Sequence, residues 1–437
     1  MKASQNKNQF KNILDELASV IPVYRQEIFK TILLGLVIGK GRKGISGIYR
    51  IFESILSSII SRKRFYCFLG SGKIPWNKLL EKIIALMGNR FLTNGKLLLA
   101  VDDTSYGKTG RKIENCDIHF DHAAKKNSAK HIYGHCRVVV GVLLFIHGRW
   151  ACLPLAQQVY RLVKNVAPRE FLTKIDIAAK LIVKILSHTD ADVLVCCDSW
   201  FGNKSLIEHE LIKTNINENR LHILSRLRKN CCLFEIPGSA PKGKRGRKRK
   251  YGKSMGTLQE IGAKAERKKG RFFIYGKYRE CEYAEFVCMN KRLQRKIKVV
   301  LVFKRGYIFP IFCTDLSLTA KQMIEYYSAR WKIESGFKEL KHELGALDNQ
   351  ARKKDAVENH FNMTCLAMSI TWVYALELEQ APDRYHPKPH SCSFSFSDIR
   401  QKIRNRYIEP VNFNGVCGKT VKLAQNLILK YFYQQVS

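Results

Sequence analysis

Acidic residues are scarce in this sequence, which contains 37 Asp and Glu against 76 Lys and Arg. The resulting net charge of +39 says little about the fold, but it indicates a polyanionic partner. Charge alone leaves three partners open: DNA, RNA in a ribosome-type complex, and an anionic lipid surface.

Long uncharged apolar runs are also missing, and a membrane-spanning helix needs about 18 such residues. The closest run, Phe361–Leu376, is interrupted by Asn362, Thr364 and other polar residues, so we interpret it as a buried helix. We therefore expect no membrane association. The 437 residues, 46% of them hydrophobic, suffice for one large domain or for two to four ordinary ones.

No C-x-x-C pair occurs among the 14 scattered cysteines, and we recognise no signal peptide. We therefore expect reduced thiols and a cytoplasmic, nucleoid-associated protein. One local group of thiols and imidazoles lies between residues 116 and 136, and such side chains can bind zinc. Its spacing matches no standard zinc finger, so a role beside DNA or the active site and a purely structural role stay open. The group is Cys116, His119, His122, His131, His135 and Cys136.

Residues 1–94 show apolar residues at helical spacing, separated by basic, glycine-containing turns. The predicted helices are Phe10–Leu17, Val23–Val37, Ile45–Ile60 and Trp76–Met87. A small basic helical domain is a common DNA-binding device, so we predict DNA binding here, with an ordinary solvated basic surface as the alternative.

Residues 95–203 follow an α/β pattern, with acids at the ends of the first and fourth strands. The expected elements are strands at Leu97–Asp102, Val138–Ile146, Trp150–Leu155 and Val193–Cys197, and a helix from about Pro168 to His188. Residues 204–318 are strand-rich, and we interpret them as a β-rich insertion. Within it, residues 241–253 hold eight Lys or Arg in an expected exposed loop, where Arg245, Arg247 and Arg249 are candidate DNA contacts.

Residues 319–376 contain a predicted helix with two distinct stripes. Tyr327, Arg330, Glu334 and Lys341 fall within about 60° of arc, because an α-helix turns about 100° per residue. Beside them, Ile333, Phe337, Leu340 and Leu344 form an apolar stripe. We expect the apolar stripe to dock on a core and the polar one to face outward. Residues 377–437 form a tail whose predicted helix, Val421–Tyr433, is a possible dimerisation element.

Three acids stand out as candidate metal ligands: Asp103, Asp198 and Glu334. Mg²⁺ prefers oxygen ligands, and two such ions can activate a water or a hydroxyl and stabilise the leaving oxygen in a phosphodiester displacement. Because neighbouring side chains of a strand face opposite ways, we expect only one of Asp102 and Asp103 to be a ligand. On their own, acids at strand ends are commonly caps or solvated residues.

The spacing of Tyr327, Arg330, Glu334 and Lys341 resembles the signature of the insertion-sequence-four transposases and of their relatives in the DDE transposase superfamily. The segments LLLAVDDTSYGKTG and VLVCCDSWFGNKSL resemble the two aspartate motifs of that group. The resemblance covers about residues 95–375. It implies a ribonuclease H-like catalytic core interrupted by a β-rich insertion, with Asp103 as the first catalytic acid, Asp102 as the alternative, and Asp198 and Glu334 as the others.

The resemblance also implies roles for other residues. Arg330 and Lys341, with Lys338 nearby, would hold phosphates at the transposon end, and Tyr327 would contact the backbone beside the cut. Relatives cut the second strand through a hairpin and capture a flipped base with an aromatic side chain. The candidates here are Tyr307, Phe309 and Phe312, each of which can instead be a strand core residue.

The sequence thus predicts a DNA transposase that uses two Mg²⁺ ions, with Mn²⁺ as a substitute. Its expected partners are the terminal inverted repeats, the target DNA and a second copy of the chain in a synaptic dimer. Two alternatives stay open: a metal-dependent nuclease on the same fold, and a non-catalytic DNA-binding protein derived from a transposase.

Overall fold

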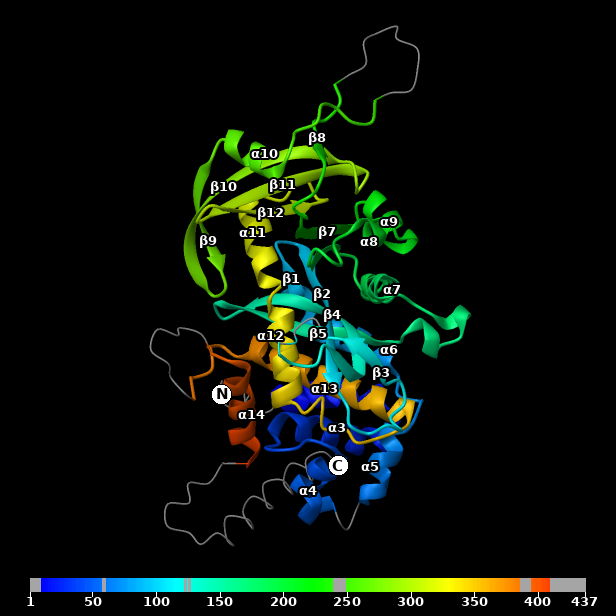
Figure 1. Ribbon diagram of the computed structural model, residues 1–437. Helices are drawn as coiled ribbons and strands as arrows, with labels where there is room; N and C mark the ends of the chain where they lie inside the picture. The colour runs from blue at the N-terminus through cyan, green and yellow to red at the C-terminus, as the bar shows by residue number, and fades with distance from the viewer. Residues whose placement is uncertain are drawn as a thin grey trace.

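A computed structural model describes residues 9–56, 60–121, 124, 127–238, 249–385 and 394–408. Within these residues the strands join into one twelve-stranded mixed sheet, with helices on both faces (Figure 1). The chain is therefore a mixed α/β protein, which is consistent with a ribonuclease H-like domain.

The first half of the sheet carries the predicted acids. Its strands are β2 (Lys96–Gly107), β4 (His131–Ile146), β5 (Arg149–Tyr160), β6 (Asp192–Cys197) and β7 (Leu221–Arg226). They lie in the order β5-β4-β2-β6-β7, in which β4 is antiparallel to both neighbours and β2, β6 and β7 are parallel. Two short strands, β1 (Leu92–Thr93) and β3 (Asp117–Phe120), pair with β2 and β4.

The second half of the sheet is antiparallel and continues from β7. Its strands are β8 (Leu233–Phe234), β9 (Lys268–Ile274), β10 (Lys277–Asn290), β11 (Arg295–Lys304) and β12 (Tyr307–Cys313). Short helices α8 (Lys204–Ile207) and α9 (Glu210–Asn217) precede β7, and α10 (Leu258–Lys264) follows β8. Because β7 pairs in parallel with β6 and antiparallel with β12, one strand joins the two halves.

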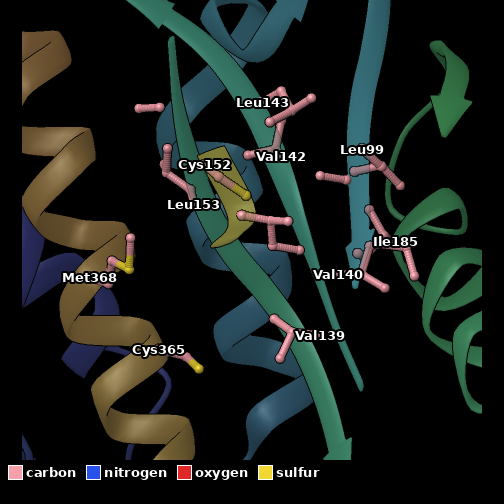
Figure 2. Packing of buried hydrophobic residues seen from close by; sticks show 14 of the residues in the cluster. Leu99, Val139, Val140, Val142, Leu143, Cys152, Leu153, Ile185, Cys365 and Met368 are labelled. Atoms are coloured by element: carbon pink, nitrogen blue, oxygen red, sulfur yellow. The ribbon is translucent and has the colours of Figure 1, made fainter. Parts of the chain in front are cut away.

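Helices cover the β2-β4-β5 region from both sides. Helix α7 (Lys174–Leu186) contributes Ile185 to one face, and α13 (Lys354–Glu377) contributes Cys365 and Met368 to the other (Figure 2). The strand residues between them are almost completely buried: Leu99, Val140, Val142, Leu143 and Leu153. These strands are apolar on both faces because each face is covered by a helix.

The N-terminal helices are α2 (Gln9–Ala18), α3 (Val23–Ile38), α4 (Ile45–Leu56), α5 (Arg62–Leu69) and α6 (Trp76–Met87), followed by a 3₁₀ turn at Gly88–Phe91. The expected helix Ile45–Ile60 is shorter than predicted, since Ile60 is not helical. These helices surround α13 and share one continuous core with the sheet (Figure 1).

Helix α7 begins later than the sequence indicated. Pro168–Glu170 is a separate 3₁₀ turn, and the helix begins at Lys174. Thr173 caps it: its hydroxyl accepts from the Asp176 N–H at 3.2 Å, and the Asp176 carboxylate accepts from the Thr173 N–H at 2.8 Å. This reciprocal capping box, rather than the upstream proline, determines where the helix begins.

The expectation of one straight helix through Tyr327 and Lys341 is wrong. Helix α11 (Ala320–Ala329) ends before Arg330, α12 (Lys332–Lys338) follows Trp331, and Glu339–Glu343 forms a π-helical turn. A helical wheel with constant rotation therefore does not apply along this segment. The apolar stripe does dock on the core, since Ile333, Leu340 and Leu344 are buried.

Helix α14 (Phe396–Ile408) packs on α3 and α13 of the same chain. The expected helix Val421–Tyr433 lies outside the described residues. No helix in the described ranges combines the length and the apolar character that crossing a membrane requires.

Candidate active site

Asp102 and Asp198 come together because β2 and β6 run parallel. Val101 pairs with Cys197 at the end of this ladder, so the next residue on each strand is an aspartate. The carboxyl ends of parallel neighbours meet at one edge of a sheet, and paired residues face the same side. The Asp198 charge accordingly raises the pKa of Asp102.

Arg330 links Asp102 to Glu334. Arg330 Nη1 lies 3.4 Å from Asp102 Oδ2, and Arg330 Nη2 lies 3.0 Å from Glu334 Oε1. Arg330 is only 8% exposed, whereas the Glu334 side chain is 32% exposed. The guanidinium is thus an inward-facing bridge between an acid on the sheet and an acid on α12.

Arg330 lies at the junction of two helices. It follows the last residue of α11 and precedes α12, and its side chain reaches Asp102 at the sheet edge. The prediction of an outward-facing polar stripe is therefore wrong for Arg330. Its Nε is buried and has no hydrogen-bond partner within the described residues, although a guanidinium can donate five hydrogen bonds.

The pKa values around this bridge reflect burial and charge. Burial raises the pKa of Asp102 to about 7, which Arg330 opposes and Asp198 reinforces. Burial alone lowers the pKa of Arg330, but Tyr327, Asp102 and Glu334 raise it above its ordinary value. The raised pKa of Asp102 therefore reflects mainly its removal from water, with the Asp198 charge as a smaller contribution.

Asp103 faces the opposite side of β2, toward α7. Its Oδ2 lies 2.8 Å from Lys174 Nζ and accepts from Cys136 Sγ at 3.4 Å. Lys174 is the first residue of α7, which covers the face away from α12. The structure therefore brings Asp102, not Asp103, to the side where Arg330 and Glu334 lie.

Asp198 is held by its own turn. Its Oδ1 accepts hydrogen bonds from the N–H groups of Trp200 and Phe201, both at 2.9 Å. Phe201 is buried and anchors this turn in the core, whereas Trp200 is 45% exposed. One oxygen of the carboxylate is thus used for positioning, and no hydrogen bond within the described residues engages the other.

The other signature residues lie around the same edge. The Tyr327 ring packs on Phe309 at 5.7 Å between centroids, and Arg330 lies 5.8 Å from its centre. Lys341 Nζ donates to the carbonyl of Ser105 at 3.0 Å, three residues beyond Asp102 on β2. Lys338 is exposed. Tyr327 is half-buried, so only part of its ring is open to a ligand.

Only part of the predicted basic loop, residues 241–253, lies within the described residues. Arg245 and Arg247 lie outside the described residues, and Arg249 is exposed. Among the aromatic candidates, Phe312 is a core residue at 1% exposed, and Tyr307, at 77% exposed, lies at a hairpin turn.

Sequence reasoning missed two exposed tryptophans beside the acids. Trp331 is 49% exposed and lies between Arg330 and Glu334, and Trp200 follows Asp198 by two residues. Tryptophan side chains are buried on average, so two exposed ones near the acids are informative once the structure is known. Their proximity to the motif acids was the available signal in the sequence.

The thiol and imidazole group divides between the two faces of β4. Cys116 Sγ lies 3.4 Å from His135 Nε2, which is also 3.0 Å from the carbonyl of Glu114. Cys136, by contrast, contacts Asp103. His122 lies outside the described residues, so the zinc hypothesis stays a prediction.

The three carboxylates Asp102, Asp198 and Glu334 provide the oxygen ligands that Mg²⁺ prefers. In the described parts of the chain, no three Asp, Glu, His or Cys side chains converge closely enough to hold a metal as they stand. Arg330 lies between two of the acids, and burial keeps the pKa of Asp102 high. The donor chemistry of the three carboxylates fits divalent cations.

A comparison with protein families matches residues 17–272 to the DDE superfamily endonucleases. The match spans more than half of the chain and contains Asp102 and Asp198, as well as Asp103, but it ends before Glu334. No curated protein matches the chain. Membership implies a nuclease that acts on DNA and uses divalent metals. With the two aspartates inside the matched region and Glu334 linked to Asp102 through Arg330, the chain belongs to the DDE superfamily endonucleases.

Proposed function

We propose that the chain is the transposase of a bacterial-type insertion sequence, which cuts DNA at terminal inverted repeats and joins the freed ends to target DNA. The proposal rests on family membership and on the signature spacing of Tyr327, Arg330, Glu334 and Lys341. Its core would be ribonuclease H-like, with the antiparallel strands after β7 as the insertion.

The observation that carries the proposal is the Asp102–Arg330–Glu334 bridge beside Asp198. We assign Asp102, Asp198 and Glu334 as the metal ligands, so that Asp102 replaces Asp103 in the catalytic set. Asp103 already has a cation, Lys174, on the far face of the sheet.

Two Mg²⁺ ions bound by these acids would activate the attacking oxygen and stabilise the leaving one. Asp102 and Glu334 arrive from different elements, so their separation depends on the sheet edge and on α12. Arg330 would hold both acids in place, because each of its two terminal nitrogens contacts one of them. Lys341, anchored on Ser105, would add positive charge farther along β2.

The remaining assignments follow the proposed function. The N-terminal helices would recognise the inverted repeat, and residues 377–437 would contribute to a synaptic dimer. We also propose that the domains of the chain end at residues 94, 203, 318 and 376. Tyr327, Lys338 and Arg249 would contact the DNA backbone, as would Arg245 and Arg247.

The test uses purified protein, Mg²⁺ and two DNA substrates: an intact element end and a pre-cleaved end with a free 3′-hydroxyl. A transposase joins the pre-cleaved end to a target plasmid, and a denaturing gel resolves nick, hairpin and joined product. Cutting without joining would favour the nuclease alternative, and binding without cutting would favour the non-catalytic one.

Glu334→Gln provides the matched variant, because glutamine keeps the shape and can still accept from Arg330 but is a poor metal ligand. We expect cleavage to disappear while binding of the end is retained. Substantial Mg²⁺-dependent cleavage by this variant would contradict the proposed site.

A further inference from the structure

A basic depression lies near the proposed active site; it contains the signature residue Lys341 but none of the proposed metal ligands. It consists of two adjoining hollows of about 630 and 560 Å³ that share Arg42, Leu347 and Asp348. We call it the basic trough. Its walls are the turn 39–43, the loop 108–113, residues 341–343 and 347–352, and one face of α14.

Charge in the trough is strongly one-sided. Ten of its lining residues are Lys or Arg and two are acidic. Both acids are already engaged, since Glu343 pairs with Arg400 at 2.7 Å and Asp348 accepts from the Lys43 N–H at 2.7 Å. Positive charge is thus left uncompensated over a continuous surface.

Five of these cations point into solvent: Lys40, Arg42, Arg111, Lys112 and Arg352. None of the five forms an ion pair within the part of the chain that the structure describes. They come from segments that are far apart in the sequence, and the fold brings them together. Cations that lie close together repel one another, and a bound polyanion would offset that repulsion.

Hydrogen bonds connect the segments that form the walls of the trough. Lys108 Nζ donates to the carbonyls of Leu347 and Asn349, both at 2.9 Å. Gly41 adopts a φ of +72°, which lets the 39–43 turn present Lys40 and Arg42 on either side of it. The exposed cations therefore project from an ordered frame.

Lys341 and strand β2 connect the trough to the proposed active site. Lys341 lines the trough and also donates to Ser105. Strand β2 carries Asp102 and then delivers Gly107 and Lys108 to the trough wall. At about 3.3 Å per strand residue, the trough begins roughly 15 Å from the acids. That distance corresponds to a few base pairs of a duplex.

We propose that the basic trough binds the phosphate backbone of a DNA duplex that flanks the scissile phosphate. The occupant is DNA rather than a membrane, because none of the large exposed apolar side chains in the described ranges lines the trough, and a surface-bound membrane protein needs such anchors. The inference rests on the proposed function in one respect: it identifies the bound polyanion as the DNA that is cut.

The test measures binding of a fluorescent DNA duplex in EDTA, across about 0.05 to 0.2 M salt. The trough variant is Arg42→Ala with Arg111→Ala. The matched control is Lys164→Ala with Arg169→Ala, because these cations between β5 and α7 are also exposed and lie outside the trough, the N-terminal helices and the proposed catalytic set. Arg42→Lys with Arg111→Lys restores charge, and thermal unfolding checks that every variant is folded.

We expect the trough variant to bind about tenfold more weakly per removed contact at 0.1 M salt, with a log–log salt slope lower by about 1.8. The control should keep the wild-type slope, and the lysine variant should regain most of it. Equal losses in trough and control variants, or no loss in either, would overturn the trough assignment.

Two further outcomes separate the trough from the proposed function. Wild-type protein that cuts and joins DNA, while the trough variant binds like the control, refutes only the trough. Failure of the wild-type protein to bind DNA refutes both. Tighter binding to an RNA duplex or to vesicles with anionic headgroups would overturn the assignment to DNA.

Discussion

Asp102 and Asp103 are neighbours in β2, yet their carboxylates contact different cations on opposite faces of the sheet. Asp102 Oδ2 lies 3.4 Å from Arg330 Nη1, and Asp103 Oδ2 lies 2.8 Å from Lys174 Nζ. The difference follows from strand alternation, because consecutive side chains leave a strand in opposite directions. It decides which aspartate can share a site with Glu334.

Replacing each aspartate in turn tests that conclusion. We expect Asp102→Asn to lower Mg²⁺-dependent DNA cleavage at least about a hundredfold, because it removes a proposed ligand. Asp103→Asn should lose much less, because its carboxylate contacts Lys174 on the other face. Single-turnover cleavage rates measure both. The reverse ranking would restore Asp103 as the catalytic acid.

Arg330→Lys tests the bridge. A lysine has one compact charge and cannot contact Asp102 and Glu334 through two separate nitrogens, as the guanidinium does. We expect cleavage to fall about 10- to 1,000-fold, with folding largely preserved. Arg279→Lys, at an exposed position of β10, is the control and should leave the rate unchanged. A wild-type rate for Arg330→Lys would show that a single charge suffices.

A buried ion pair between β4 and α13 should contribute strongly to stability. Arg137 is completely buried, its Nη1 and Nη2 donate to Glu358 at 2.7 and 3.0 Å, and its Nε donates to Tyr106 Oη at 2.7 Å. Arg137→Ala leaves the acid and the phenol without this partner. We expect a loss of about 3–5 kcal/mol in the free energy of unfolding, measured in urea.

The control for that measurement is a surface pair. Lys268 lies 3.4 Å from Glu285 and its side chain is 52% exposed, so Lys268→Ala should cost less than about 1 kcal/mol. If Arg137→Ala prevents folding, Glu358→Gln provides a milder change at the same pair. Equal effects at the buried and surface pairs would contradict the prediction.

Stability should rise with pH between about 4 and 6.5, in part through His360. This residue is 1% exposed, its Nε2 lies 3.3 Å from the Lys43 carbonyl, and burial lowers its pKa to about 4. In that window the unfolded chain binds a proton that the folded chain excludes, so stability falls as the pH falls from 6.5 toward 4.

One such histidine changes the free energy of unfolding by at most about 1.4 kcal/mol per pH unit. His360→Asn removes the titrating group, and we expect a flatter pH profile of the urea midpoint. His135, whose pKa burial also lowers to about 4, would account for part of the remaining slope. An unchanged profile in His360→Asn would assign the effect to other groups.

Much of the fold was predictable from local pattern. The strand before Asp198 was placed correctly to within one residue, whereas β2 continues beyond the predicted end at Asp102 to Gly107. These strands are hydrophobic along their length because both of their faces are buried, and such continuous apolar runs can be recognised in a sequence. The start of α7 was misplaced because Pro168 resembles a helix start, whereas the Thr173 capping box begins the helix.

The break before α12 was not predictable in the same way. Local propensity favours helix throughout 320–343, and nothing in the spacing marks Arg330 as the point of interruption. The position of Arg330 depends on tertiary packing at the sheet edge, where its buried guanidinium contacts the carboxylates of Asp102 and Glu334. A wheel that assumes constant rotation cannot represent such a tertiary contact.

By itself, the sequence determined the class of partner, the order of the elements around the acids and the residue types available for catalysis, because charge and periodicity are local properties. Only the tertiary structure decided which aspartate faces Arg330 and Glu334, since that depends on how β2 pairs with β6. It also assembled the basic trough, whose walls come from residues as distant as 39 and 404. Contacts between distant segments arise only when the chain folds.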